Sequence, residues 1–360
     1  VKRIHRPVNA EGKTVSVGSY MIPLLEENCE KAGVQILLNT TANEILTDAS
    51  GAAVGIKATG STGETVTVNA KAVVLTTGGF GANLDMVVEY KPELKGFMTT
   101  NAAGAQGQGI EMATAIGADT INLDLVKKYP QGVETTPGHG LAATASSTDT
   151  IKKSGAIYVN QDGKRFVNER EGLGVLTDAT IAQPNHIAYI VMDDAAWKLY
   201  VAKSLEDKLV PNAEALDQWA KISNQGVPVM AVSNNLADAA KVMGINPENL
   251  AKTVEDWNAM AKNGKDDAFN RPITGALGAG PYHIVEQKVR YQTTLGGLKA
   301  NGNLAILNQK DAVIPALYGA GCVVGGANGA DSMTAMMNSW AIVSGVVAAD
   351  SAVKYVRSQK

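Results

Sequence analysis

The stretch best suited to chemistry is LYGAGCVVGGANGADSM, residues 317–333, which is rich in glycine and contains no proline. Glycine lets main-chain N–H groups approach a ligand closely. The apolar, small-residue segment that follows is typical of a helix, and a helix start favours negative charge. A cofactor with phosphates, a ribityl chain or an electron-accepting ring would suit both features, and so would a tight packing turn between a strand and a helix. The stretch by itself leaves both interpretations open.

The composition excludes several classes of protein. The chain has 360 residues, of which 45% are hydrophobic and 19% charged, so it can bury a large core and is expected to hold two domains. The net charge of -3, with both signs interspersed, predicts no nucleic-acid or membrane-surface partner. No apolar run is as long as a membrane span requires, so no membrane span is expected. The first residue is Val1, so the N-terminus does not distinguish the cytoplasm from a bacterial cell envelope.

The cysteines and histidines predict no metal site. The two cysteines, Cys29 and Cys322, form neither a metal motif nor a disulfide framework. The four histidines show no ligand spacing, so a structural or catalytic zinc is not expected.

The signals for secondary structure alternate along the chain. Residues 16–33 have helical spacing of apolar side chains and end at a glycine, and residues 34–40 are typical of a short buried strand. Residues 43–77 are short β-rich segments separated by glycine-containing turns. The last of these segments, residues 72–75, has the continuous apolar character of a strand buried on both faces. Residues 107–118 predict a short amphipathic helix.

The order of these elements indicates one domain inserted into another. Residues 121–285 mix helices and strands, whereas strands and a long apolar helix return after residue 286. We therefore expect an outer domain made of residues 1–120 and 286–360, with residues 121–285 inserted. The expected fold class is α/β, with an α+β inserted domain.

A set of ordered motifs runs through nearly the whole chain, and the longest is SGAIYVNQDGKRFVNE at 154–169. The others are HRP at 5–7, VVLTTGGFGAN at 73–83, NAAG at 101–104, GQG at 107–109, FNRP at 269–272, TLGG at 294–297 and LYGAG at 317–321. Through these motifs the chain resembles the fumarate reductase flavoprotein family, in its soluble flavocytochrome c and urocanate reductase branch.

The resemblance implies that FAD is the cofactor and that the outer domain is a Rossmann-like FAD-binding domain, interrupted by a capping substrate domain. In that family the LYGAG turn and the following helix start lie along the ribityl chain and the flavin ring. The helix start there faces the end of the ring where negative charge gathers on reduction. The implied FAD contacts are Thr76, Thr77, Gly78, Gly79, Gly296, Gly319, Ala320, Gly321, Cys322, Ser332, Met336 and Met337.

Two departures from the family bear on FAD binding. Where the family usually has a glutamate after GAG, this chain has Cys322, whose thiol is a weak acceptor. We interpret Cys322 as a buried small side chain rather than a redox group, since no cysteine lies near it in the sequence. The strand–GxGxxG–helix unit that carries the FAD pyrophosphate in the family is missing. A fragment is the simplest explanation, and such a fragment is expected to bind FAD weakly or not at all.

The implied chemistry is the reduction of an activated C=C bond. It needs a hydride from flavin N5 on one carbon, a proton on the other, and cations or donors on the electron-withdrawing group. Fumarate reductases use arginines and histidines for this purpose. In this chain the donor-arginine position holds Leu173, the late clamp arginine is replaced by Ser332, and the two histidine positions hold Tyr129 and Thr293. Tyr129 at its position resembles the urocanate reductase branch.

Four side chains remain as catalytic candidates: Tyr129, Arg170, Asp149 and Lys152. Asp149 and Lys152 correspond to the glutamate and arginine of the family's proton relay. Tyr129 could donate a proton or hold a carbonyl, and the other three could form a relay. The alternative for Lys152 is an ordinary exposed lysine, and the alternative for Arg170 is an ion pair with a neighbouring glutamate in a solvated loop.

We therefore expect an FAD-dependent reductase or dehydrogenase that acts on CH–CH bonds, with a small conjugated olefin other than fumarate as its substrate. The reason is the loss of the arginine fork, which lysine does not replace in bidentate recognition. The alternatives are a non-catalytic fragment and a flavin protein that passes electrons or binds a ligand without turnover. The electron donor is open, a fused or separate haem or FMN module included, and no nicotinamide site stands out.

Overall fold

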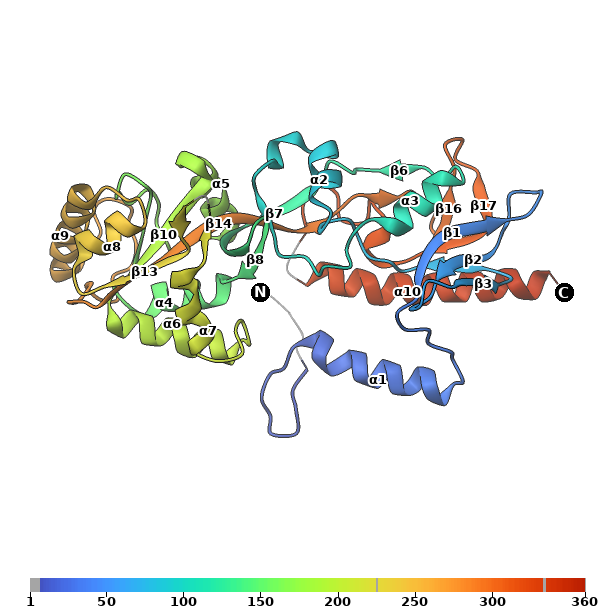
Figure 1. The fold of residues 1–360 in the computed structure, drawn as a ribbon, viewed down its shortest axis with the longest axis horizontal. Coiled ribbons are helices and arrows are strands. Elements are labelled where there is room, and N and C mark those ends of the chain that lie inside the picture. The colour runs from blue at the N-terminus through green and yellow to red at the C-terminus, as the bar shows by residue number, and fades with distance from the viewer. Residues whose placement is uncertain (1–6, 225, 333–334, 360) are drawn as a thin grey trace. The chain divides into compact units, whose positions relative to one another are not determined.

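The computed structural model describes residues 7–224, 226–332 and 335–359, and these form two compact units (Figure 1). Unit 1 consists of Val1–Thr77, Gln108–Ile121 and Gly297–Lys360, and unit 2 consists of Gly78–Gly107 and Asn122–Gly296. The chain therefore passes from one unit to the other more than once, as an inserted domain requires. Residues 78–107 and 286–296, which the sequence assigned to the outer domain, lie in unit 2.

Unit 1 contains two small sheets. The antiparallel sheet has the order β1 (Thr41–Thr47), β2 (Ala53–Thr59), β3 (Thr65–Asn69), and its strands come from the β-rich segments expected at 43–77. The second sheet has the order β16 (Ala305–Leu307), β17 (Val313–Gly319), β4 (Val73–Leu75), and β17 runs parallel to β4. A short pairing joins β6 (Thr120–Ile121) to β15 (Gly297–Leu298).

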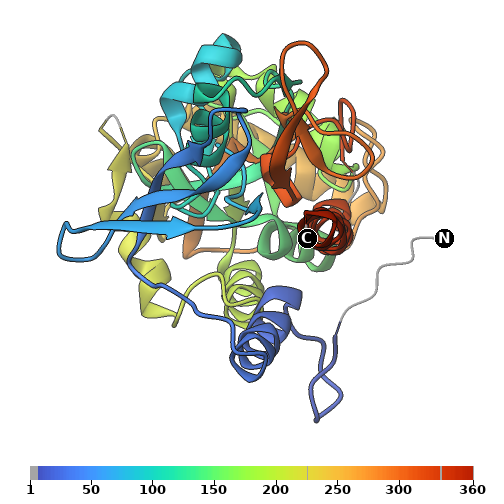
Figure 2. The ribbon, with the colours of Figure 1, turned by 90° about the vertical axis from the view of Figure 1, so that its right-hand side faces the viewer.

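Three helices accompany these sheets: α1 (Val17–Lys31), α3 (Gln108–Ala115) and α10 (Met336–Ser358). In Figure 2, α10 (red) is seen end-on beside the orange strands of unit 1, and it packs against β17. The helices predicted at 16–33 and 107–118 are thus confirmed as α1 and α3, each within three residues of its expected ends.

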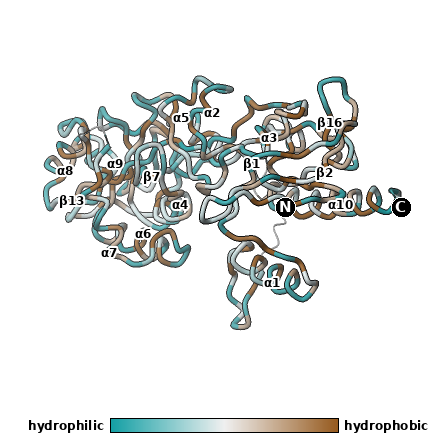
Figure 3. The backbone as a smooth tube through the Cα atoms, turned by 45° about the vertical axis from the view of Figure 1, so that its right-hand side comes forward, coloured by the Kyte–Doolittle hydropathy of each residue, from teal (hydrophilic) through white to brown (hydrophobic). Residues whose placement is uncertain are grey.

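The strand predicted at residues 34–40 does not form. Val34, Ile36, Leu37 and Leu38 lie in irregular backbone and are exposed, and α1, along which hydrophobic positions (brown in Figure 3) recur, has no buried residue. A strand needs a neighbour to pair its N–H and C=O groups, and no strand in the described ranges lies alongside this segment. Apolar character alone therefore predicted the strand wrongly.

Helix α10 also differs from expectation. By length and composition it is long and apolar enough to cross a membrane, although polar residues such as Asn338, Ser344 and Asp350 interrupt its apolar run. The expectation that no segment reaches the length of a membrane span was therefore too strong. A core helix of a water-soluble protein passes the same test, so the observation decides neither way.

Unit 2 is built on a seven-stranded sheet. Its order is β5 (Met98–Thr99), β8 (His139–Ala142), β7 (Val126–Thr136), β14 (Tyr282–Thr294), β10 (Ile187–Met192), β9 (Ile157–Val159), and β13 (Met230–Ser233) also pairs with β14. A two-stranded ribbon, β11 (Ser223–Asn224) with β12 (Val227–Pro228), lies outside this sheet. Strand β14 is the longest and carries most of the pairings.

Alternate residues of the central strands feed two separate cores, as the two-residue period of a strand requires. One core contains Ile190, Met192 and Val285 and is covered by α4 (Thr144–Lys153), α5 (Leu173–Ile181) and α6 (Asp194–Glu206). The other contains Tyr189, Val191 and Ile284 and is covered by α8 (Leu236–Val242) and α9 (Pro247–Asn263). The remaining helices are α2 (Leu84–Tyr90), α7 (Glu214–Asp217) and the short 3-10 turns Pro92–Leu94, Pro184–His186 and Gln218–Lys221.

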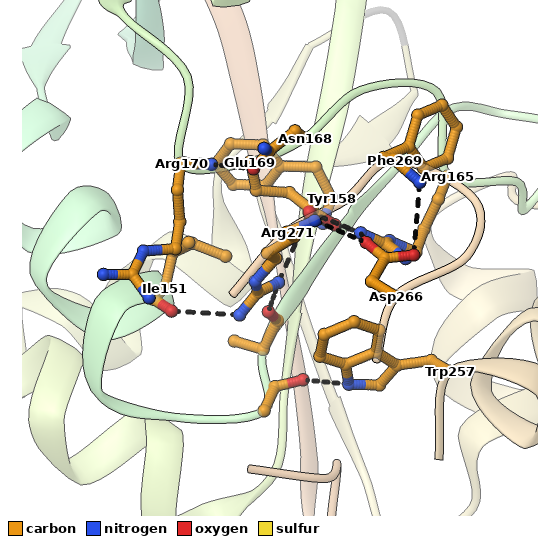
Figure 4. A network of polar contacts seen from close by, with 12 residues as sticks. Ile151, Tyr158, Arg165, Asn168, Glu169, Arg170, Trp257, Asp266, Phe269 and Arg271 are labelled. Atoms are coloured by element: carbon orange, nitrogen blue, oxygen red, sulfur yellow. Dashed lines mark hydrogen bonds and ion pairs between the residues drawn. The ribbon is translucent and has the colours of Figure 1, made fainter. Parts of the chain in front are cut away.

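A buried ionic network joins the GKRFVNE segment to the residues after α9 (Figure 4). Arg165 donates to both carboxylate oxygens of Glu169, at 2.7 Å each, and to Asp266 Oδ2 at 2.9 Å. Its guanidinium lies over the Trp257 ring at 4.5 Å. Arg271 donates to the carbonyl oxygens of Ala156 and Ile151 at 2.7 and 2.9 Å. The motif therefore has a clear structural role in fixing the loop that precedes α5.

We predict that Asp266→Asn destabilises unit 2 by about 3 kcal/mol, because it leaves the buried Arg165 guanidinium partly unpaired. Burial by itself would raise the pKa of Asp266, but the hydrogen bond and charge of Arg165 outweigh it and lower the pKa. A lowered folded-state pKa adds stability above the unfolded-state pKa, and this stability is lost as the pH falls through the folded-state value.

Urea unfolding between pH 3 and 7 tests this prediction. The free energy of unfolding of the variant should fall less steeply as the pH is lowered than that of the parent protein. Asp267→Asn is the matched control, because Asp267 is exposed and pairs only with exposed Lys265 in the described ranges. Equal unfolding midpoints for the two variants would contradict the role of the network.

Candidate functional site

The strand ends that lead into the two glycine-rich turns predicted to contact FAD are neighbours in unit 1. Strands β4 and β17 are parallel neighbours, with Gly319 opposite Leu75, so their carboxyl ends meet at the same edge of the sheet. Ala320 N–H donates to Leu75 C=O at 2.9 Å and extends the pairing by one step. Thr76 and Thr77 follow β4 and are exposed. In open α/β sheets this edge is where ligands bind.

Gly78 and Gly321 supply the conformation that these turns need. Their φ angles are +77° and +71°, in the left-handed region that favours glycine. A Cβ built at Gly78 would meet no atom within 4 Å, and one at Gly321 would meet only Ala341 at 3.9 Å. Open space therefore lies in front of both glycines, where a ligand could approach the backbone.

Other glycines of the predicted set are explained by packing. A Cβ at Gly319 would lie 2.7 Å from the Val324 side chain, and one at Gly296 would lie 2.0 Å from the Asn122 carbonyl oxygen. Gly79 is buried directly after Gly78. The interpretations left open for the LYGAG stretch thus apply to different residues, since Gly319 fits a packing turn while Gly321 also has an open side.

Helix α10 holds the second turn in place. Gly321 N–H donates to Ser344 Oγ at 2.9 Å, and Trp340 Nε1–H donates to the Gly321 carbonyl oxygen at 3.0 Å. The helix begins at Met336 after Ala335, whose φ is +69°, and no side chain of the described residues caps it. An uncapped helix start leaves backbone N–H groups and a partial positive charge for an anionic or electron-rich group.

The remaining predicted FAD contacts have mixed surroundings. Met337 Sδ accepts from Asn328 Nδ2 at 3.0 Å, and Ser332 is buried, with its N–H bonded to Asp331 Oδ1 at 2.7 Å. Cys322 is a half-buried free thiol, and burial raises its pKa, so it stays neutral. Residues 333 and 334, between Ser332 and the helix, lie outside the described ranges, as do His5 and Arg6 of the HRP motif.

In unit 2, Tyr129 lies on β7 directly opposite Arg290 on β14. The Arg290 guanidinium carbon is 4.9 Å from the centre of the Tyr129 ring, and Lys127 Nζ lies 5.4 Å from the same ring. Tyr129 is half-buried, whereas Arg290 is only 3% exposed. Sequence analysis did not single out Arg290. The only local signal was its place between the two large side chains Val289 and Tyr291.

Neutral groups alone hydrogen-bond to the Arg290 guanidinium in the described ranges. Its Nη1 donates to Thr100 Oγ1 at 3.0 Å and to Gln292 Oε1 at 2.6 Å, and its Nη2 donates to Thr144 Oγ1 at 3.1 Å. Its Nε is buried without a partner. Burial lowers the pKa of Arg290 to about 10, against the opposing effect of Tyr129. Strongly perturbed groups of this kind mark functional sites more often than chance.

The other catalytic candidates are not joined to Tyr129 by any contact in the described ranges. Asp149 on α4 pairs with Lys153 at 2.8 Å, one turn away, and Lys152 is exposed. Arg170 donates from its backbone to Asn168 Oδ1 at 3.0 Å and from Nη1 to the Pro272 carbonyl at 3.4 Å. Leu173 begins α5, and its side chain offers no proton.

These turns fit FAD at its ribityl and flavin end. Within unit 1, the open side of Gly321, the parallel ends of β4 and β17 and the start of α10 are what a long, electron-accepting cofactor requires. Gly321 and the exposed hydroxyls of Thr76 and Thr77 are the groups of unit 1 that would hold it. Gly78, the first residue of unit 2, has an open side of its own.

Comparison with known proteins agrees with this fit. Residues 2–336 match the model of the FAD binding domain family. The fumarate reductase (cytochrome) of Shewanella frigidimarina is 33% identical over 356 residues, which are 99% of this chain and 57% of that protein. The urocanate reductase of Eggerthella lenta is 34% identical over 84% of this chain and 48% of its own length. The chain thus spans about half the length of these curated relatives.

A solved structure shows the same fold. The open conformation of a flavocytochrome c3 fumarate reductase has a TM-score of 0.78 to this chain, with 28% identity, and the match covers 98% of this chain and 58% of the other. The α/β FAD-binding fold with a capping domain, expected from the sequence, is confirmed. The chain therefore belongs to the FAD-binding domain family, among the fumarate reductase flavoproteins, and its cofactor is FAD.

Proposed function

We propose that the chain carries the FAD-binding and substrate-binding parts of an oxidoreductase that reduces, or in reverse forms, an activated C=C bond. The observation that carries this proposal is the half-buried phenol of Tyr129 set against the buried cation Arg290, in a family whose relatives bear the names fumarate reductase and urocanate reductase. A positioned hydroxyl beside a fixed positive charge is a suitable proton donor for this reaction.

When bound, reduced FAD supplies a hydride to one carbon of the double bond. The other carbon then needs a proton, and in our proposal the O–H bond of Tyr129 breaks to provide it, with the bonding electron pair left on the phenol oxygen. This transfer neutralises the charge that develops next to the electron-withdrawing group of the substrate. Tyr129 regains a proton from solvent or from the Asp149, Lys152 and Arg170 side chains proposed as a relay.

The substrate that we propose is a small conjugated olefin other than fumarate. Binding two carboxylates requires two sets of cationic donors. The positions where the family carries such donors hold Leu173, Thr293 and Ser332, none of which is charged. Arg290 cannot take over both roles, since it is buried and its Nη atoms already bond to threonine and glutamine side chains.

A flavin protein that passes electrons, or binds a ligand without turnover, is the second candidate. It is favoured by the pairing of Asp149 with Lys153 instead of Lys152, which leaves the proposed relay unformed in this structure. In either case the electron donor is open, and a haem or FMN module, fused to the chain or separate, is one candidate.

We predict that Gly321→Ala weakens FAD binding about tenfold or more, because the added methyl group would occupy the open side of the turn at φ +71°. A titration followed by flavin fluorescence, with absorbance after desalting, measures the effect. Gly63→Ala in the β2–β3 turn is the matched control, since its φ is +86° with nothing within 4 Å and the backbone strain is similar. Equal FAD affinity in both variants would remove Gly321 from the site.

We predict that Tyr129→Phe lowers kcat by about 100-fold or more, since general acid catalysis contributes roughly 10²–10⁴-fold. The flavin spectrum should stay unchanged, because Tyr129 lies on β7 and not in the turns that we expect to contact FAD. Stopped-flow oxidation of the reduced flavin by substrate measures the rate. A variant as fast as the parent protein would assign proton donation to another group.

We predict that kcat/KM for fumarate lies at least about 30-fold below that for the best olefin with one activating group, because one missing charged contact costs about 2 kcal/mol or more. A panel of fumarate, a monocarboxylic enoate and an enone, each at several concentrations, measures this ratio. Comparable values for fumarate would overturn the substrate assignment.

A further inference from the structure

Arg290 is a buried charge without a counter-charge in the described ranges. Its side chain is almost inaccessible, it forms no ion pair there, and its three hydrogen bonds go to two hydroxyls and one amide oxygen. Its Nε has no partner. A cation buried in this way is unfavourable unless a negative charge can form beside it. The pKa of Arg290, lowered by burial to about 10, reflects the same unfavourable position.

The only phenol in contact with this cation within the described ranges is that of Tyr129. The two residues are directly opposite each other in the antiparallel pairing of β7 and β14, and the guanidinium lies 4.9 Å from the ring centre. Tyr129 is half-buried and so partly exposed, whereas Arg290 is covered. Arg290 is therefore placed to act on Tyr129 and not to touch a substrate.

Few other charges lie near this pair. Lys127, on the same strand as Tyr129, lies 5.4 Å from the ring and is half-buried. On α4, which packs against β7, Asp149 is paired with Lys153, and α5, which packs against both β7 and β14, carries Asp178. The adjacent strand β8 carries His139. Within the described ranges, no carboxylate contacts either Tyr129 or Arg290.

We propose that Arg290 is a positioning residue that stabilises the phenolate of Tyr129 after this tyrosine has donated its proton. The inference rests on the proposed function, in which the Tyr129 O–H bond breaks, the proton moves to a substrate carbon and the electron pair stays on oxygen. Before the transfer the buried Arg290 guanidinium faces a neutral phenol, and after it the guanidinium and the phenolate carry opposite charges that offset each other. The burial of Arg290 in a water-poor site strengthens this attraction without further rearrangement.

A direct titration of the phenol tests the inference without relying on turnover. The chain has ten tyrosines, so the ultraviolet absorbance of tyrosinate is recorded for each protein and for the same protein with Tyr129→Phe, and the difference isolates Tyr129. A positive charge within about 4–6 Å lowers the pKa of an acidic group by about one to three pH units. We expect the midpoint of the Tyr129 titration to rise by at least about one pH unit in Arg290→Gln. The glutamine keeps one NH₂ donor group and removes the positive charge. An unchanged midpoint would overturn the inference.

Two further variants separate charge from structure. Arg290→Lys keeps the charge and should hold the midpoint within about half a unit of the parent protein. Lys127→Met removes the more accessible cation and should shift the midpoint less than Arg290→Gln, because water screens that charge. If Arg290→Gln unfolds before the phenol titrates, the comparison of Arg290→Lys with Lys127→Met decides. In that case Arg290→Lys should stay within about half a pH unit of the parent protein and Lys127→Met should shift the midpoint by less than about one unit. A rise of about one unit or more in Lys127→Met, with circular dichroism showing both variants to be folded, would assign the stabilising charge to Lys127 and overturn the inference.

Turnover distinguishes this inference from the proposed function. If Tyr129→Phe reduces substrate as fast as the parent protein, the proton-donor role fails, while the titration still reports whether Arg290 stabilises the phenolate. If Tyr129→Phe is slow but the midpoint does not depend on Arg290, the donor role stands and the inference about Arg290 is wrong.

Discussion

The antiparallel pairing of β7 with β14 is the constraint on which unit 2 depends. Strand β14 also pairs with β10, β13 and β5, so the hydrogen bonds of most of the sheet pass through it. Two register shifts interrupt its pairing with β7, near Arg290 and Thr293. Such irregularities re-aim side chains at sheet sites. Here they lie where the proposed proton donor and its cation face each other.

In unit 1, too, the pairing of strands positions the residues of the candidate site, although the sheet is smaller. The parallel pairing of β4 with β17 places side by side two strand ends that lead into glycine-rich turns and are more than two hundred residues apart in the sequence. Helix α10 then fixes one of these turns through Trp340 and Ser344. The exposed apolar residues of α1 and of the segment 34–38 stand outside this arrangement, since no described strand or helix covers them.

The buried ionic network of Arg165, Glu169, Asp266 and Arg271 explains the longest motif of the chain in structural terms (Figure 4). Its residues were noticed because they match a family motif, and their role here is to fix the loop before α5. Arg290 is the opposite case. No motif draws attention to it, and its properties come from burial against Tyr129 without an acidic partner in the described ranges.

The sequence by itself determined the family, the cofactor, the alternating order of elements and the approximate ends of α1 and α3, because motifs, glycine positions and apolar periodicity are local properties. It failed at residues 34–40, since a strand exists only if another strand pairs with it. It predicted the long apolar helix α10 but underestimated the length of its apolar run, which polar residues interrupt. Only the tertiary structure decided which glycines are packed and which are open, that Asp149 pairs with Lys153, and that Arg290 lies opposite Tyr129. Each of these depends on strand register or helix packing between residues far apart in the chain, and no local pattern encodes it.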